Sequence, residues 1–128
     1  MPAAQKELQV LIADDDSTTR HVLRLLLREQ GHRVVAEAQD GERAVELCAA
    51  HRPDIAFLDI NMPRLDGHTA AERIRVASPR VSMIMVTNLP TLDNVQKAMQ
   101  IGVGGFVVKP FNATKVVEAI DSCLKQRR

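Results

Sequence analysis

Five short apolar runs alternate with segments of helical periodicity, and this alternation restricts the fold more than any other feature of the sequence. The runs are rich in Val, Ile, Leu or Met and read LQVLIA (8–13), RVVAEA (33–38), DIAFLD (54–59), VSMIMVT (81–87) and GFVVK (105–109). Their length and composition predict β-strands. Between them, apolar residues recur at the spacing of amphipathic helices, for example at Val22, Leu23, Leu26 and Leu27 and again at Val116, Val117, Ile120, Cys123 and Leu124.

Turn residues separate these predicted strands and helices and complete a βαβαβαβαβα pattern. They are Gly31, Asp40-Gly41, Asp66-Gly67 and Gly104-Gly105. Strands that alternate with helices form a parallel sheet covered on both faces, and the near-continuous apolar segments VLIA and MIMV suit strands buried on both sides. The sequence therefore predicts an α/β fold, a doubly wound three-layer sandwich around a five-stranded parallel sheet.

Composition and charge are those of one soluble globular domain. The chain has 128 residues, of which 45% are hydrophobic and 26% charged, and its net charge of +1 indicates no direct binding of nucleic acid. No apolar window approaches the roughly 20 residues of a membrane span, and the start MPAAQKE lacks the apolar core of a signal peptide. We expect a cytoplasmic domain over residues 8–125 without membrane contact, between a flexible N-terminal tail (1–7) and a C-terminal tail (126–128).

The cysteines and histidines show no metal-ligand spacing. Cys48 and Cys123 belong to the second and the last predicted helix, which should cover opposite faces of the sheet, so a disulfide between them is excluded. We expect the histidines to be solvated surface residues: His21, His32, His51 and His68.

Polar residues gather where the predicted strands end. In a doubly wound sheet, ligands bind beyond the carboxyl ends of the strands, where the strand order reverses. The residues at these ends are Asp14, Asp15 and Asp16, then Asp59, Thr87 and Lys109-Pro110. Carboxylates this close repel one another, so we expect a cation among them. Mg²⁺ is the natural candidate, because it binds carboxylate oxygens and phosphate oxygens together. With a lysine and a hydroxyl beside them, they suit phosphoryl transfer, in which a carboxylate can be the nucleophile.

Four motifs in order, LIADDDSTTR, DIAFLDINMPRLDG, IMVT and FVVKPF, cover much of the chain. In these motifs the chain resembles response-regulator receiver domains of the chemotaxis CheY type, over nearly its whole length. The resemblance implies a flavodoxin-like (βα)5 fold with strand order 2-1-3-4-5. It also implies a domain of two-component signalling that catalyses its own phosphorylation and dephosphorylation and is not a conventional enzyme.

The resemblance assigns a role to each residue of the site. Asp59 is the position that accepts a phosphoryl group from a histidine kinase or a phosphotransfer protein. Asp14 and Asp15, with Asp59 and the backbone carbonyl of Asn61, are the positions that hold Mg²⁺. Lys109 is the position that pairs with phosphoryl oxygens, and Thr87 the hydroxyl that moves to bond them. Phe106 takes the place of a switch tyrosine, and Lys109-Pro110 is expected to be a cis peptide. A downstream partner is expected to bind the surface made by the fourth helix, fifth strand and fifth helix.

One position departs from the family pattern. Relatives usually follow the switch threonine with alanine or glycine, whereas this chain has Asn88 and then Leu89. A small residue leaves an open path for the leaving group and for attacking water. We expect Asn88 to narrow that path and slow the reaction, the alternative being that its amide orients the water.

Other polar residues receive structural interpretations. Asp16 is expected to cap the first helix, and Asp54 and Asp66 to be strand-entry and turn residues. The stripe Arg20, Arg24 and Arg28 is expected to be a solvated helix face, with docking of an acidic kinase surface as the alternative.

Three alternative functions share features with this sequence. A haloacid-dehalogenase-like phosphatase also uses a strand-end aspartate, and DDDST contains its Asp-x-Asp spacing, but Ser17 replaces its glycine and no acidic pair follows Lys109. A receiver-like scaffold that is never phosphorylated does not need the complete acidic set. A fragment of a longer DNA-binding regulator stays compatible with the sequence.

Overall fold

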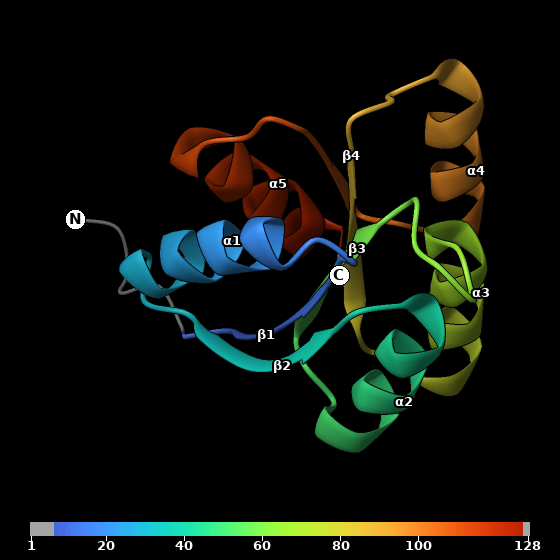
Figure 1. The fold of residues 1–128 in the computed structure, drawn as a ribbon, viewed down its shortest axis with the longest axis horizontal. Coiled ribbons are helices and arrows are strands. Elements are labelled where there is room, and N and C mark those ends of the chain that lie inside the picture. The colour runs from blue at the N-terminus through green and yellow to red at the C-terminus, as the bar shows by residue number, and fades with distance from the viewer. Residues whose placement is uncertain (1–6, 127–128) are drawn as a thin grey trace.

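The computed structural model describes residues 7–126 and shows, within that range, five strands and five helices in strict alternation (Figure 1). The strands are β1 (Gln9–Ala13), β2 (Arg33–Ala38), β3 (Ile55–Asp59), β4 (Ser82–Thr87) and β5 (Gly105–Val108). The helices are α1 (Ser17–Glu29), α2 (Gly41–His51), α3 (Gly67–Ala77), α4 (Leu92–Ile101) and α5 (Ala113–Lys125). The predicted tails fall mainly on residues 1–6 and 127–128, which lie outside the described residues.

The strands form one parallel sheet in the order β2-β1-β3-β4-β5, which confirms the predicted fold. The order reverses between β1 and β3, so the carboxyl ends of these two neighbouring strands face the crevice in which doubly wound folds bind ligands. Helices α1 and α5 cover one face, and α2, α3 and α4 cover the other (Figure 1). Between residues 7 and 126, no helix combines the length and the apolar character that crossing a membrane requires.

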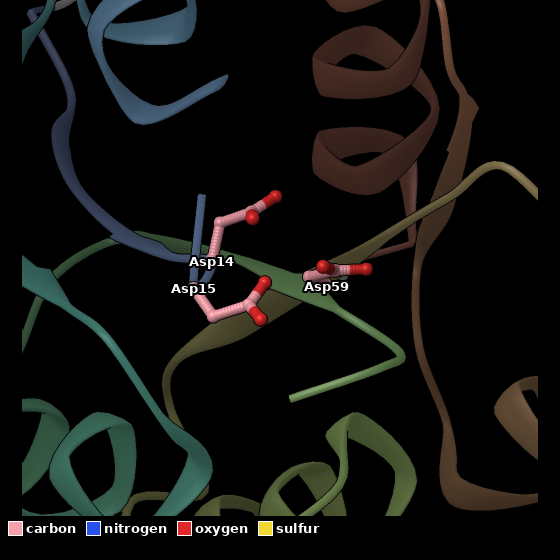
Figure 2. A group of neighbouring side chains, drawn as sticks. All are labelled: Asp14, Asp15 and Asp59. Carbon is pink, nitrogen blue, oxygen red and sulfur yellow. The ribbon is translucent and has the colours of Figure 1, made fainter. Parts of the chain in front are cut away.

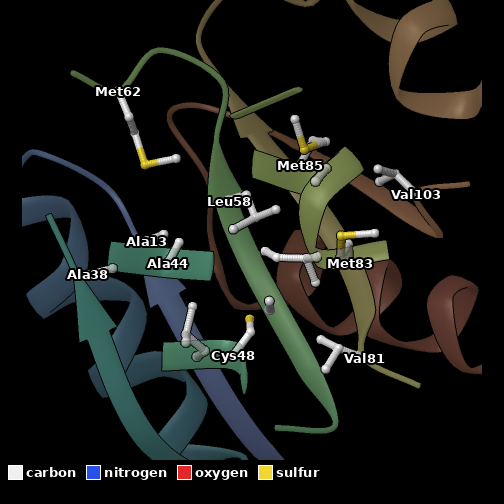
Figure 3. Close-up of a cluster of buried hydrophobic side chains, with 14 of the residues drawn as sticks. Ala13, Ala38, Ala44, Cys48, Leu58, Met62, Val81, Met83, Met85 and Val103 are labelled. Atoms are coloured by element: carbon white, nitrogen blue, oxygen red, sulfur yellow. The ribbon is translucent and has the colours of Figure 1, made fainter. Parts of the chain in front are cut away.

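The two faces of the sheet carry different hydrophobic cores, because successive strand side chains point to opposite sides. Toward α1 and α5 the core is built from large branched or aromatic residues such as Leu23, Phe57 and Ile120. Toward α2, α3 and α4 it consists largely of alanines and methionines; Figure 3 shows Met62, Met83 and Met85 among them. The second layer therefore holds more small and flexible side chains than the first, beside branched residues such as Leu58 and Ile74.

The two cysteines lie in these separate cores, as predicted. Cys48 of α2 and Cys123 of α5 are both buried, on opposite faces of the sheet, and form no disulfide with each other. Burial raises the pKa of the Cys48 thiol to about 12.

The prediction that all four histidines are solvated was wrong for His32. Its side chain is buried at 7% exposure, just before β2, and its Nδ1 accepts a hydrogen bond from the Leu8 N–H at 3.2 Å. Burial lowers the pKa of His32, because the charged imidazolium loses hydration there. A single histidine between a turn and a strand shows no periodicity, so its hydrogen bond between the starts of β1 and β2 is not predictable from the sequence.

The lowered pKa of His32 makes stability depend on pH. The unfolded chain binds this proton more readily than the folded one, so the contribution of His32 is intact above about pH 6.5 and is lost as the pH falls below it. In His32→Asn, an amide oxygen can replace Nδ1 as acceptor without titrating. Urea unfolding from pH 8 to 5 should show a smaller loss of stability for His32→Asn than for wild type, while exposed His51→Asn follows wild type. Parallel curves for wild type and His32→Asn would contradict the assignment.

Candidate functional site

Three carboxylates converge at the carboxyl edge of the sheet, where the strand order reverses (Figure 2). Asp14 and Asp15 follow β1, and Asp59 ends the neighbouring β3. One carboxylate oxygen from each lies within 4.8 Å of the others. Asp14 and Asp59 are buried, at 2% and 5% exposure, whereas Asp15 is exposed. The fold thus concentrates three negative charges on one partly buried spot.

Backbone hydrogen bonds hold the segment after β1 in place. The Asp14 N–H donates to the Ala38 carbonyl of β2 at 3.0 Å, and the Asp14 Oδ1 accepts from the Asp16 N–H at 2.9 Å. Asp16 is the N-cap of α1, as predicted: its carboxylate accepts from the Thr18 N–H and from the Thr19 hydroxyl. These bonds, the Thr19 hydroxyl foremost, lower the pKa of Asp16. Asp16 therefore serves the helix and lies outside the carboxylate cluster.

A close backbone approach fixes the end of β3. The Gly67 N–H, at the start of α3, donates to the Ile60 carbonyl at 2.7 Å. A Cβ atom at Gly67 would lie 2.3 Å from the Asp59 carbonyl oxygen, so only glycine fits there. The Asn61 N–H donates to Asp59 Oδ1 at 3.3 Å, and the Asn61 side chain is exposed. Asp66, a predicted turn residue, caps α3 by accepting from the Thr69 N–H.

Lys109 supplies the positive charge of the site. Its Nζ lies 2.9 Å from Asp14 Oδ2 and 3.4 Å from Asp59 Oδ2. Burial lowers the pKa of Lys109, but the hydrogen bond and charge of Asp14 and the charge of Asp59 outweigh it, and the net shift is upward. The ammonium therefore stays charged. The backbone N–H of Lys109 donates to the Thr87 carbonyl at 2.7 Å. The Lys109-Pro110 peptide is cis, as expected.

One ammonium group does not neutralise three carboxylates, and the pKa of Asp59 reflects the excess of negative charge. Burial, followed by the charge of Asp14, raises this pKa to about 6 against the opposing effect of Lys109. A further cation would relieve the repulsion. The donor set consists of hard oxygen atoms, and its 4.8 Å spread is close to the roughly 4.2 Å across a six-coordinate Mg²⁺ shell, so this ion fits with some ligands bound directly and others through water.

Thr87, Phe106 and Asn88 lie around this cluster without joining it. Thr87 ends β4 beside β3; its side chain is fully buried, and its hydroxyl accepts from the Leu89 N–H at 2.9 Å. Phe106 pairs with Met85 across β4 and β5 and is half-buried against the α2–α3–α4 core. Asn88 is exposed and lines a hollow beside Lys109 together with Thr18, Val22 and Phe111.

The arginine stripe on α1 is not the solvated face that the sequence suggested. Arg20 and Arg24 both pair with Glu37 of β2, and the Arg20 side chain is only 13% exposed. Its Nη1 also donates to the Asp14 carbonyl at 2.6 Å. Only Arg28 is exposed as predicted. The clue in the sequence was Glu37, an acidic residue that follows the apolar run Val34–Ala36 in β2, where partial burial requires a partner.

Two further residues near the site, His68 and Asn94, make contacts that the sequence did not predict. His68, at the start of α3, was assigned to the surface, but it is half-buried, and its Nε2 lies 3.1 Å from the Asn94 carbonyl of α4. The Asn94 side-chain amide in turn donates to the Leu89 carbonyl at 2.9 Å. The contact between His68 and Asn94 joins segments 26 residues apart, and no local pattern in the sequence reveals it.

A parallel sheet of order 2-1-3-4-5, with acidic residues and a lysine at its carboxyl edge, defines a flavodoxin-like α/β domain of the receiver class. The chain belongs to the response regulator receiver domain family, which matches residues 10–121. The receiver family is not a family of conventional enzymes.

Individual relatives agree with this assignment. The transcriptional regulatory protein PdtaR of Mycobacterium tuberculosis is 40% identical over 121 residues, which cover 94% of this chain but only 58% of PdtaR. The chemotaxis protein CheY of Bacillus subtilis is 39% identical over 116 residues, covering 91% of this chain and 97% of that protein. In the solved CheX-CheY-BeF3-Mg²⁺ complex from Borrelia burgdorferi, the similar chain is 32% identical with a TM-score of 0.87, covering 91% of this chain and 88% of that one.

Magnesium should stabilise the folded domain through the carboxylate cluster. At a concentration about ten times its Kd, an ion bound only by the folded state adds roughly 1.4 kcal/mol to the free energy of unfolding. Asp15→Ala should lose most of this gain and should be the more stable protein without metal, because one repelling charge is gone. Thermal unfolding with and without MgCl2 measures both effects, with exposed Asp121→Ala on α5 as the control. Equal magnesium stabilisation of wild type and Asp15→Ala would contradict the site.

Proposed function

We propose that this domain takes a phosphoryl group from the phosphohistidine of a sensor histidine kinase or a phosphotransfer protein onto Asp59, in a Mg²⁺-dependent reaction, and thereby switches its α4–β5–α5 surface. The observation that carries the proposal is the position of the Lys109 ammonium between the buried carboxylates of Asp14 and Asp59, at the reversal point of a receiver sheet. Membership of the receiver family supports the same role.

Asp59 is the carboxylate best suited to be the nucleophile. Both oxygens of Asp14 have short partners, the Asp16 N–H on Oδ1 and Lys109 Nζ on Oδ2, each at 2.9 Å. The partners of Asp59 are more distant, at 3.3 Å and 3.4 Å. Its raised pKa of about 6 makes it more basic than an ordinary aspartate, and nucleophilicity rises with basicity. Asp14 and Asp15 are left to organise the ion.

The transfer needs no other covalent group. An oxygen of the Asp59 carboxylate attacks phosphorus, the P–N bond to the donor histidine breaks, and its electron pair returns to the imidazole nitrogen. Lys109 pairs with a phosphoryl oxygen, and the Thr87 hydroxyl can donate to another after moving. Asp14, Asp15, Asp59 and the Asn61 carbonyl would hold Mg²⁺, which when bound neutralises charge on the phosphoryl oxygens. Water later attacks the acyl phosphate and releases inorganic phosphate, which regenerates Asp59.

The surface proposed to carry the signal already displays apolar residues. A phosphoryl group adds nearly two negative charges and three acceptor oxygens to Asp59. When Thr87 moves toward them, it vacates space on the side of the sheet where Phe106 is half-buried. The adjoining surface exposes Leu92 and Met99 of α4, at 73% and 70%, and Val108 of β5 at 38%. Apolar side chains exposed to this extent suit a surface for an as yet unidentified partner protein.

The phosphatase alternative loses its main sequence feature. The second aspartate of its Asp-x-Asp spacing is Asp16, which is engaged as the cap of α1. Residues 10–121 also match the receiver domain family. PdtaR is longer than the region it shares with this chain, so the activity of a complete protein that contains this domain is a separate proposal.

Phosphorylation of Asp59 can be tested directly. Incubation with acetyl phosphate and Mg²⁺ should add one phosphoryl group to the intact protein, seen by mass spectrometry, and Asp59→Asn should not be labelled. Asp66→Asn is the matched control, because it makes the same chemical change at a cap position where asparagine serves equally well. Labelling that survives in Asp59→Asn would assign the nucleophile to another residue.

The effect of Asn88 on the rates is a second test. Because Asn88 borders the approach to Lys109, we expect Asn88→Ala to accelerate phosphorylation by acetyl phosphate about three- to tenfold, as removal of a steric obstruction of roughly 1 kcal/mol would. The phosphorylated half-life should shorten and magnesium affinity should stay the same. Stopped-flow mixing measures the first rate, and phosphate release measures the second. A longer half-life would show that Asn88 orients the attacking water instead.

A further inference from the structure

A series of hydrogen bonds leads from the buried Thr87 hydroxyl, through the loop before α4, to the start of α3. The Leu89 N–H donates to Thr87 Oγ1 at 2.9 Å, the Asn94 amide donates to the Leu89 carbonyl at 2.9 Å, and His68 Nε2 lies 3.1 Å from the Asn94 carbonyl. A carbonyl only accepts, so the Nε2 of His68 is the donor. We call these four residues, Thr87, Leu89, Asn94 and His68, the Thr87–His68 relay.

The relay matters for α4 because this helix is less deeply packed than α3, although Val95 and Ile101 are half-buried. This helix buries only Ala98 completely, whereas α3 buries Gly67, Ala70, Ala71 and Ile74. The α4 residues Leu92 and Met99 are largely exposed. A helix with so little apolar anchorage depends more on the polar contacts at its N-terminal end.

The other end of the relay is firmly anchored. His68 follows Gly67, whose backbone packs directly against the Asp59 carbonyl and bonds to Ile60. Asn94 is also oriented within α4, because its N–H donates to the capping hydroxyl of Thr91 at 3.1 Å. The relay therefore connects a fixed point beside Asp59 to the movable hydroxyl of Thr87.

We propose that Asn94 and His68 are positioning residues that hold the loop and the Thr87 hydroxyl in the arrangement of the unphosphorylated domain. The inference rests on the proposed function, in which Thr87 must turn toward a phosphoryl group on Asp59. When it turns, the Leu89 N–H loses its acceptor, and the loop must move to find another. Each bond of the relay therefore favours the resting arrangement and lowers the population that is ready for phosphorylation.

Variants separate this role from simple helix stability. Asn94→Ala removes the donor to Leu89 without adding charge. Asn94→Asp also removes it but places an acidic side chain in the first turn of α4, where the helix dipole favours it. His68→Ala removes the link to α3, and His68→Gln offers an amide donor in its place. His51→Ala, at an exposed position on α2, is the control.

Two measurements test the relay. Hydrogen exchange of the Leu89 amide in the resting protein, followed by NMR, should be about three- to tenfold faster in Asn94→Ala, Asn94→Asp and His68→Ala, the change expected from one lost hydrogen bond. The rate constant for phosphorylation by acetyl phosphate at saturating Mg²⁺ should rise by a similar factor in the same variants. His68→Gln and His51→Ala should stay within about twofold of wild type in both.

The outcomes distinguish the two proposals. If wild type is not phosphorylated, the proposed function fails and the inference about Asn94 and His68 falls with it. If wild type is phosphorylated but the relay variants react at the wild-type rate or more slowly, the proposed function stands and the relay does not restrain the switch. Faster exchange without faster phosphorylation likewise overturns the inference. Faster exchange and faster phosphorylation, both restored by His68→Gln, support it.

Discussion

The contact on which the site depends is the one between the Lys109 ammonium and two buried carboxylates. Asp14 and Asp59 come from adjacent strands, and Lys109 follows β5 on the far side of β4, so only the folded sheet brings the three groups together. In an extended chain these charges would separate and be hydrated. The sheet keeps them close in a partly buried place, where burial, followed by the charge of Asp14, raises the pKa of Asp59 to about 6. A cation bound at this cluster would offset that cost.

The two cores suit different tasks. The layer under α1 and α5 is filled by Leu, Ile, Val and Phe side chains, which have few alternative packings. The layer under α2, α3 and α4 mixes Leu, Ile and Val with six buried alanines and three buried methionines, and methionine adapts its shape readily. The proposed switch residues Thr87 and Phe106 adjoin this second layer. A structural change at Asp59 is therefore accommodated more readily by the layer that contains the proposed output helix α4. The layer under α1 and α5 is the more rigid of the two.

Sequence reasoning succeeded where the determining physics is local. Strand and helix periodicity predicted the ten elements, and Asp16 was identified as a cap because the residues it bonds are two and three positions away. The strand order came from the family resemblance, since alternation alone does not specify which strands are neighbours. Burial of His32, pairing of Arg20 with Glu37 and the bond from His68 to Asn94 were missed. Each depends on how distant segments pack, and a single polar residue carries no periodicity.

The missing side chain of Gly67 has a mechanical consequence. Because the first turn of α3 rests on the Asp59 carbonyl with no Cβ between them, α3 and the end of β3 must move as one body. Helix α4 is joined to the end of β4 by hydrogen bonds instead: the Asn94 amide donates to the Leu89 carbonyl, and the Leu89 N–H donates to the Thr87 hydroxyl. Under the proposed function, a shift of Asp59 would therefore carry α3 with it and change the boundary between α3 and α4, which His68 and Asn94 bridge, next to the α4–β5–α5 surface.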